Sequence, residues 1–318
     1  MYQDLHIVDF HVHFPTSKPM MGGSYADHGE HPRGPDKAAV IRSWTKMYNQ
    51  EWRLAWDFPQ PEADGRSDEE QADRWAAEVE RYELDRVVFV TGGGNDNLAA
   101  VVARHPDKFV AFAHHNLFAP DAAAELERAV TQLGFRGYKL LAPALEKPID
   151  DKSAWPVWEV AEQYDIPVLI HFGILGSGGG VAWHENINPL RLHDVARAFP
   201  TVKFVVPHFG CGYLRETLQL CWSCANVCVD SSGSNQWVRW MSEELTTKML
   251  FRKYLETIGP ERLIFATDSS WFPRGFAVRY LQDQLRDCRE LNVSHEALQA
   301  VFGGNAARLL KLEPDERR

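Results

Sequence analysis

The sequence lacks the long apolar runs that place a chain in a membrane. Hydrophobic residues make up 45% of its 318 residues, but apolar stretches such as residues 87–90 are short, whereas a membrane-spanning helix needs about 20 residues. The chain also does not begin with a basic segment followed by an apolar one, as a secretory signal does. We therefore expect a soluble, cytoplasmic protein.

Clusters of basic residues are missing as well. The chain has 34 Lys and Arg against 44 Asp and Glu, which gives a net charge of −10. Without a basic patch, nucleic acid and anionic membranes are poor partners. We expect the partner to be a small-molecule substrate.

Cysteine is scarce and unevenly placed. There are five cysteines, an odd number, and four of them fall within residues 211–228, which is unlike a secreted disulfide framework. Cys221 and Cys224 form a C-x-x-C pair that could be redox-active or half of a zinc site. Because no second pair accompanies it, we predict buried, reduced thiols.

The chain does contain a recurring unit, in which a short apolar run ends in polar residues and a helical stretch follows. The predicted strands are residues 5–10, 86–90, 109–113, 137–141, 167–170, 203–207, 226–229 and 263–267. The predicted helices between them are residues 96–105, 120–133, 154–164, 189–199, 212–223, 242–258 and 274–291. Eight strands alternating with helices favour a (β/α)8 TIM barrel over a doubly wound sheet. We expect residues 1–318 to form this single domain.

Two segments depart from the repeat. Residues 14–81 are too long for a simple connection after the first strand, and we interpret them as an aromatic-rich insertion. Its helical stretch, residues 36–58, carries aromatic side chains at steps of four, which share one face: Trp44, Tyr48, Trp52 and Trp56. This face either packs on the barrel or forms a lid or a homodimer contact.

The second departure is residues 173–188, where a run of glycines follows the fifth strand. The glycines are Gly176, Gly178, Gly179 and Gly180. Neither the G-x-G-x-x-G pattern nor a phosphate-binding lysine accompanies them. We therefore predict a flexible active-site loop rather than a phosphate cradle.

Histidines and one aspartate lie where predicted strands end. His11 and His13 follow the first strand, and positions two apart in a strand point to the same side. His171 ends the fifth strand, His208 the sixth and Asp268 the eighth. Because barrel enzymes place catalysis at this face and divalent ions take imidazole and carboxylate ligands, the pattern predicts a metal site.

These residues sit in motifs that resemble the amidohydrolase superfamily, specifically the amidohydrolase-2 branch that includes aminocarboxymuconate-semialdehyde decarboxylase. The matching segments are residues 9–13 (DFHVH), 134–140 (GFRGYKL), 207–210 (PHFG), 226–233 (NVCVDSSG), 259–269 (GPERLIFATDS) and 303–310 (GGNAARLL). The likeness covers nearly all of the chain except residues 14–81.

The resemblance implies a mononuclear site. His11, His13, His171 and Asp268 would hold one Zn²⁺, or another divalent ion such as Mn²⁺, and His208 would act as acid/base beside it. Asp268 could also hydrogen-bond a metal-bound water, whose pKa a divalent ion lowers from 15.7 to about 7. Imidazole suits proton transfer near neutral pH.

Three roles are open for Lys139, at the end of the fourth strand. In binuclear relatives that resemble dihydroorotase, a lysine at this strand is carboxylated and bridges two metals. Alternatively, Lys139 faces the substrate or pairs with an acid, or it has no role in the site.

Further side chains could line the substrate pocket. His115 follows the third strand, Trp183 and His184 lie in the glycine-rich loop, and Arg274 follows Asp268. Arg274, and Arg53 in the insertion, could each clamp a carboxylate, while an indole could stack on a planar substrate.

Three functions fit this sequence. The first is a metal-dependent hydrolase that attacks a lactone, amide or similar carbonyl bond of a small carboxylated substrate, aromatic or not, with metal-bound hydroxide. The second is a non-oxidative decarboxylase that uses the same site. The third is a non-catalytic binding barrel, which the complete set of five site residues disfavours.

Overall fold

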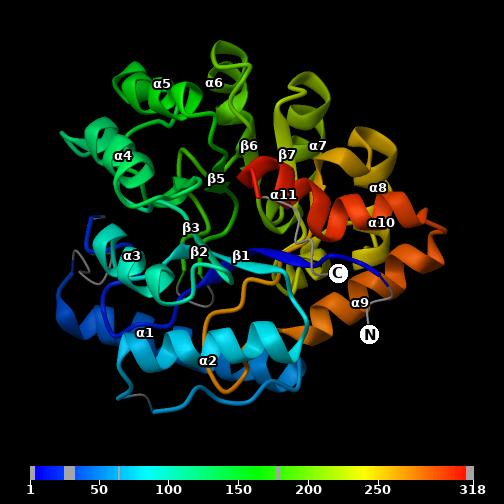
Figure 1. The fold of residues 1–318 in the computed structure, drawn as a ribbon, viewed down its shortest axis with the longest axis horizontal. Helices are drawn as coiled ribbons and strands as arrows, with labels where there is room; N and C mark the ends of the chain where they lie inside the picture. Colours follow the sequence, from blue (N-terminus) through cyan, green and yellow to red (C-terminus); the bar gives the residue numbers. More distant parts are fainter. Residues whose placement is uncertain (1–3, 25–32, 64, 177–179, 313–318) are drawn as a thin grey trace.

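A computed structural model describes residues 4–24, 33–63, 65–176 and 180–312. Short strands alternate with helices along the chain (Figure 1). Within the described residues the strands are β1 (Val8–His13), β2 (Arg86–Thr91), β3 (Phe109–Ala111), β4 (Tyr138–Leu141), β5 (Val168–His171), β6 (Phe204–Val206), β7 (Val227–Asp230) and β8 (Leu263–Ile264). Each overlaps a strand predicted from the sequence.

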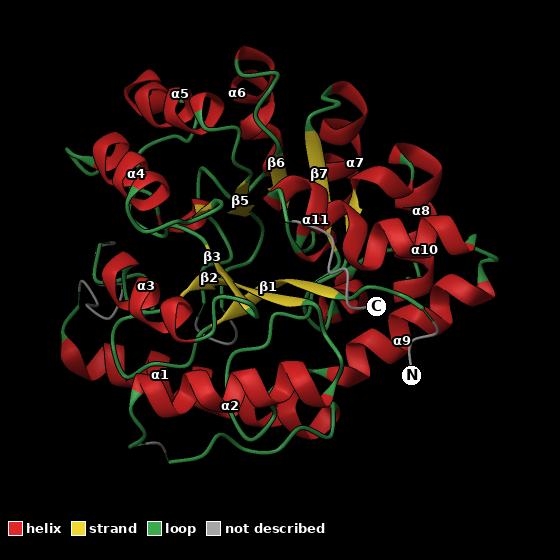
Figure 2. Ribbon diagram, viewed as in Figure 1, coloured by secondary structure: helices red, strands yellow, loops and turns green. Residues whose placement is uncertain are grey.

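The helices lie outside the strands, as the red coils around the yellow arrows in Figure 2 show. Those that follow a strand are α3 (Asn95–Arg104), α4 (Ala122–Thr131), α5 (Trp155–Gln163), α6 (His193–Ala198), α7 (Leu214–Ser223), α8 (Thr247–Ile258) and α9 (Val278–Glu290). The long connection after β1 holds α1 (Pro35–Ala55) and α2 (Asp68–Arg81), and the C-terminal part holds α10 (His295–Gln299) and α11 (Asn305–Leu310). In the described part of the chain no helix combines the length and apolarity needed to cross a membrane.

The strands form a closed parallel ring. Regular pairing gives two sheets, β1-β2-β3 and β4-β5-β6-β7-β8. A bridge between Ala113 and Tyr138 joins β3 to β4, and a bridge between Val12 and Ser269 joins β1 to the segment after β8. The predicted TIM barrel is thus confirmed, and its first and last strands meet.

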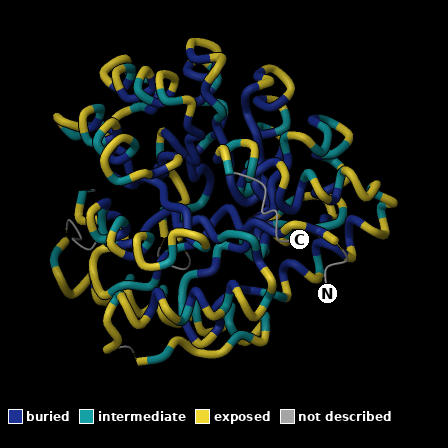
Figure 3. The backbone as a smooth tube through the Cα atoms, viewed as in Figure 1, coloured by how far each residue is buried: buried dark blue, intermediate teal, exposed yellow. Residues whose placement is uncertain are grey.

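An apolar layer fills the inside of this ring. Its members come from β1, β2, β3, β5 to β8, the segments that directly follow β3 and β8, and α11: Val8, Phe10, Val88, Val90, Val110, Phe112, Leu169, Val205, Cys228, Ile264, Ala266, Ala306 and Leu310. The central part of the chain trace is accordingly buried (Figure 3). In β4, Tyr138 and Leu140 belong to the outer core instead. Since side chains alternate along a strand, Lys139 points inward among the apolar layer.

The side chains of β1 do not alternate regularly between the inside and the outside of the barrel. Val8 and Phe10 belong to the inner layer and Val12 to the outer core, whereas strict alternation would have put Val12 inside. The pairing with β2 is irregular between Asp9 and Val12, as at a β-bulge. This irregularity lets His11 and His13 face inward above Phe10.

The long segment after β1 contains the helix predicted for it, while its interpretation as an aromatic-rich insertion stays a prediction. Helix α1 overlaps the predicted stretch 36–58. Helix α2 was not predicted, although its capping box, in which Ser67 and Glu70 cap each other's backbone, is a sequence signal. Trp52 and Trp56 pack on other aromatic rings, whereas Trp44 and Tyr48 are about half exposed. A lid or a homodimer contact through this face stays a prediction.

Cys221 and Cys224 lie in the packed interior of the protein. Both thiols are free and buried. Arg262 Nη1 donates to the carbonyl oxygens of Cys221 at 2.9 Å and of Cys224 at 3.2 Å. The C-x-x-C pair therefore belongs to the packing of α7, in line with the prediction of buried thiols.

The inner layer leads to a prediction about stability. Phe112 is fully buried and meets Phe10 edge-on, with ring centroids 5.5 Å apart. Phe112→Ala should lower the free energy of unfolding by about 3–5 kcal/mol, because it leaves a cavity in a tightly packed site. Denaturant unfolding measures this. Trp222→Ala, at a side chain that is 78% exposed, is the control and should change stability by less than about 0.5 kcal/mol; equal losses would contradict the prediction.

Candidate metal centre and active site

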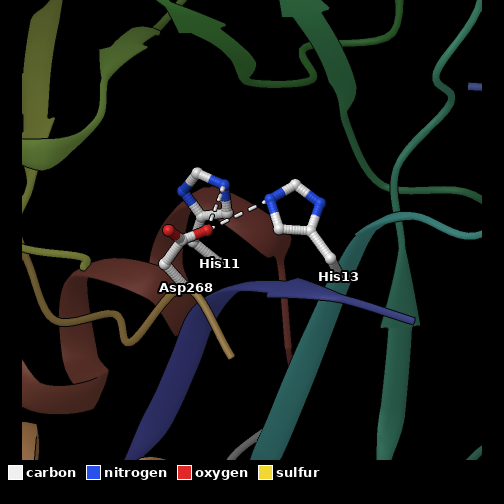
Figure 4. A group of neighbouring side chains, drawn as sticks. All are labelled: His11, His13 and Asp268. Atoms are coloured by element: carbon white, nitrogen blue, oxygen red, sulfur yellow. Dashed lines mark ion pairs between the residues drawn. The ribbon is translucent and has the colours of Figure 1, made fainter. Parts of the chain in front are cut away.

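His11, His13 and Asp268 converge at one end of the barrel (Figure 4). Asp268 Oδ1 lies 3.1 Å from His13 Nε2 and 3.9 Å from His11 Nε2. One ligand atom from each of the three residues lies within 4.8 Å of the others. Two imidazole nitrogens and one carboxylate oxygen at this spacing suit a zinc-like divalent ion.

The backbone places Asp268 opposite the two histidines. Asp268 N–H donates to His11 O at 2.9 Å, and Arg274 Nη2 donates to Asp268 O at 2.9 Å. Asp268 has φ 60°, in the left-handed region, where a non-glycine residue costs about 1–3 kcal/mol. Below it, Asp9 Oδ1 accepts the Thr267 N–H at 2.9 Å. These contacts fix the strained residue against β1.

Hydrogen bonds to Nδ1 orient both histidines. His13 Nδ1 lies 2.6 Å from Thr91 Oγ1, and His11 Nδ1 lies 3.1 Å from Asp230 Oδ2. Each Nε2 is therefore turned toward Asp268. A hydrogen bond at the far nitrogen is what metal-binding histidines in proteins almost always make, because it fixes the ring and its tautomer.

The electrostatics of the site favour the protonation states that bind a metal. Burial, together with the neighbouring charge of Lys139, lowers the pKa of His11 well below the ordinary value. Burial also lowers the pKa of His13, against the opposing effect of Asp268. Burial raises the pKa of Asp268, but the hydrogen bond with His13 and the nearby imidazoles outweigh it and hold that pKa low. Neutral imidazoles beside an ionised carboxylate result, as metal binding requires.

His208 lies beside this group. Its ring centroid is 5.1 Å from that of His11 and 5.0 Å from that of His171. His208 has φ 57°, again in the left-handed region. A Cβ added to Gly233 would lie 3.3 Å from His208 Nδ1, so the glycine leaves room for the ring.

His171, the fourth predicted ligand, stands at the edge of the cluster. It ends β5 and is buried, but its Nε2 donates to Ile174 O, 3.0 Å away in its own loop. Among the described residues it is not part of a group of ligand atoms within 4.8 Å. The other ring nitrogen, Nδ1, is the one that His171 could offer to an ion.

Lys139 reaches the site from the inner layer of the barrel. Its side chain is buried, and its Nζ lies 3.3 Å from His11 Nε2. Burial lowers the pKa of this amine to about 8, although the charges of Asp230 and Asp268 oppose the shift. Lys139 is thus a neighbour of the proposed ligands, which agrees with a role inside the site.

Three of the predicted substrate residues are not brought to the cluster. The ring nitrogens of His115 lie 3.3 Å from Asn95 Nδ2 and 2.9 Å from Ala122 O, so His115 is held on its own side of the barrel. Trp183 is 83% exposed. His184 Nδ1 accepts the Asn186 N–H at 3.1 Å, within its own loop. The predicted glycines 178 and 179 lie outside the described residues.

Arg53 and Arg274 do meet, on the indole of Trp271. Their guanidinium carbons lie 5.2 and 3.7 Å from the centroid of the Trp271 ring. Trp52 of α1 packs on the same indole at 5.5 Å. Each arginine has a buried Nε without a hydrogen-bond partner among the described residues. Of this group, Arg274 contacts Asp268 directly, through its bond to the Asp268 carbonyl oxygen.

Sequence reasoning missed the residues that support the histidines. Asp230 and Ser232 contact both His11 and His208, and Thr91 contacts His13. The signal was available in the motif NVCVDSSG, in which a carboxylate and hydroxyls follow a buried strand. Their partners lie far away in the chain, so spacing alone could not assign them a role.

The comparisons agree with this arrangement. The family model of amidohydrolase-2, described as "Amidohydrolase", matches residues 8–312. A gamma-resorcylate decarboxylase of Rhizobium sp. is 36% identical over 229 residues, 59% of this chain and 70% of that protein. The decarboxylase orsB of Emericella nidulans is 33% identical over 143 residues, which are 37% of this chain and only 43% of that protein's length.

Among solved structures, 5-carboxyvanillate decarboxylase of Novosphingobium aromaticivorans, complexed with manganese and 4-hydroxy-3-methoxy-5-nitrobenzoic acid, has the same fold. The TM-score is 0.61 at 17% identity, over 98% of this chain and 97% of that chain. At this identity the likeness concerns the fold alone. The match of the family model over residues 8–312 identifies the chain as an enzyme of the amidohydrolase superfamily, and it belongs to the amidohydrolase-2 family, as its motifs predicted.

Proposed function

We propose that this protein is a metal-dependent, non-oxidative decarboxylase of an aromatic carboxylic acid. The observation that carries the proposal is the His11, His13 and Asp268 cluster with the Arg274–Trp271 contact directly beside it. The sequence alone placed hydrolysis first and decarboxylation second. The names of the curated relatives, a gamma-resorcylate decarboxylase among them, support the second reaction.

The donor set fits a single divalent ion, Zn²⁺ or Mn²⁺. His11 and His13 would give Nε2, Asp268 an oxygen, and His171 its Nδ1. When bound, the ion supplies positive charge that stabilises negative charge on the oxygen atoms of the substrate.

The residues of the chain then have separate tasks. Arg274 and Arg53 bind anionic or phenolic oxygens of the substrate through their guanidinium groups, because guanidinium forms strong bonds to such oxygens. Trp271 and Trp52 pack against the aromatic ring. This wall fits a planar substrate better than a flexible one, and we infer that it is a hydroxybenzoate.

His208 moves the proton. The bond between the ring carbon and the carboxylate breaks, CO₂ leaves, and the electron pair stays on the ring carbon. That carbon takes a proton from His208, which regains it from solvent. Ser232 Oγ and O, 2.8 and 3.2 Å from His208 Nδ1, orient the imidazole, and general acid–base catalysis contributes typically 10²–10⁴-fold.

The reaction type can be tested with a panel of ortho-hydroxybenzoates. We expect one equivalent of CO₂ for each phenol formed, deuterium at the former carboxylate carbon when the reaction runs in D₂O, and no ¹⁸O from labelled water in the phenol. Mass spectrometry of the products measures all three. Solvent ¹⁸O in the product of a lactone or amide substrate, with no CO₂ from the acids, would instead identify a hydrolase.

Removal of a ligand tests the metal centre. Asp268→Ala should weaken binding of Zn²⁺ by more than the 10–100-fold that is typical when a partner behind a ligand is lost, since it removes the one carboxylate of the cluster. Competition with a chromophoric chelator gives the affinity. Glu256→Ala, at a carboxylate on the surface of α8, is the matched control and should bind Zn²⁺ like the wild type; an unchanged affinity in Asp268→Ala would refute the assignment.

His208 can be separated from the ligands. His208→Asn should retain the bound metal but lower kcat by about 10²–10⁴-fold, the usual contribution of a positioned proton donor. Metal analysis and steady-state kinetics on one preparation measure both. Retained turnover would remove His208 from proton transfer, and loss of the metal would make it a ligand instead.

A further inference from the structure

Asp230 is a buried carboxylate that touches two histidines with different proposed tasks. It ends β7 and is fully buried. Its Oδ2 lies 3.1 Å from His11 Nδ1. Its Oδ1 accepts the backbone N–H groups of His208 at 3.1 Å and Ser232 at 2.9 Å. One side chain thus underlies both the proposed ligand and the proposed proton donor.

Ser232 joins the same two rings. Its Oγ lies 2.8 Å from His208 Nδ1 and 3.2 Å from His11 Nδ1, and it also bonds to Asp230 Oδ1. Its carbonyl oxygen lies 3.2 Å from His208 Nδ1. The hydroxyl is therefore the centre of a four-residue network.

The positions of the hydrogens follow from the donors and acceptors present. The backbone N–H groups of His208 and Ser232 both donate to Asp230 Oδ1, which favours the ionised carboxylate. An ionised carboxylate only accepts, so Asp230 takes a hydrogen from His11 Nδ1 and the hydroxyl hydrogen from Ser232. With its hydrogen used, the Ser232 hydroxyl can only accept from His208, and the Ser232 carbonyl also only accepts. His208 Nδ1 must then carry a hydrogen as well. This pattern satisfies each buried polar atom of the network, as buried groups require.

We propose that Asp230 and Ser232 form a positioning pair that keeps a hydrogen on Nδ1 of both His11 and His208. Nε2 of His11 is then free to bind the metal, and Nε2 of His208 is free to take up and pass on a proton. The pair acts through the histidines and does not touch the substrate. The link between metal ligand and proton donor builds on the proposed function, whereas the tautomers themselves do not depend on it.

The pair can be distinguished from ordinary buried polar groups because the chain offers a matched control. Ser231 is also fully buried. Its Oγ donates to Gln284 Oε1 at 2.6 Å and accepts the Ala266 N–H at 3.4 Å, and neither of these bonds involves a histidine. Ser231→Ala removes a buried hydroxyl one residue away from Ser232 but leaves the network intact.

The first experiment reads the tautomers of the metal-free protein by long-range ¹H–¹⁵N NMR of the imidazoles. His11→Gln and His208→Gln assign the signals by their disappearance. We expect the Nδ1–H tautomer for both residues in the wild type. Ser232→Ala removes the nearer acceptor at His208 Nδ1, so it should shift the His208 signals, while Ser231→Ala should not. An Nε2–H tautomer at either histidine in the wild type would overturn the proposal, whether or not the protein is a decarboxylase.

The second experiment measures Zn²⁺ affinity with a chromophoric chelator. Asp230→Asn puts an amide N–H where His11 Nδ1 needs an acceptor, so the affinity should fall about 10–100-fold, as for other partners behind a metal ligand. Ser231→Ala should keep the wild-type affinity. Equal losses of Zn²⁺ affinity in both variants would mean that any buried polar substitution here loosens the site, and would refute the positioning role of Asp230 and Ser232. If Asp230→Asn does not fold, Ser232→Ala decides: unshifted His208 signals would equally refute it.

Discussion

The seam between β1 and β8 is the contact on which the candidate site depends. Here Asp268 N–H donates to His11 O at 2.9 Å, and His13 N–H donates to Ser269 O at 2.8 Å. Asp9 anchors the same seam by accepting the Thr267 N–H at 2.9 Å. Since these bonds close the ring of strands, β1 and the segment after β8 meet where the ligands must face each other.

Closing the ring buries His11 fully and leaves the side chain of His13 only 16% exposed, which has a cost and a use. Burying unpaired polar groups is unfavourable by about 1–3 kcal/mol each, and the structure offsets this through partners such as Thr91, Asp230 and Ser232. In return, burial keeps the imidazoles of His11 and His13 neutral. The hydrogen bonds behind the ligands thus belong to the chemistry of the site as much as to its stability.

The barrel and the cluster leave the reaction open, because one fold and one metal site can serve several chemistries. The side chains that surround the metal ligands distinguish one reaction from another. Here α1 brings Trp52 onto Trp271, and Arg274 stacks on the same indole. The aromatic residues of α1 therefore divide into a packed half beside the site and an exposed half around Trp44 and Tyr48.

The sequence by itself determined the barrel and its ligand candidates. Apolar runs of strand length alternating with helices require buried parallel strands, and His11, His13 and Asp268 follow such runs. It could not determine the bulge in β1, the separation of His171 from the cluster, or the network of Asp230 and Ser232. These features depend on contacts between residues far apart in the chain, and local patterns contain no information about which distant atoms meet. Only the closed ring decided those contacts, because it fixed which side chains lie together at its end.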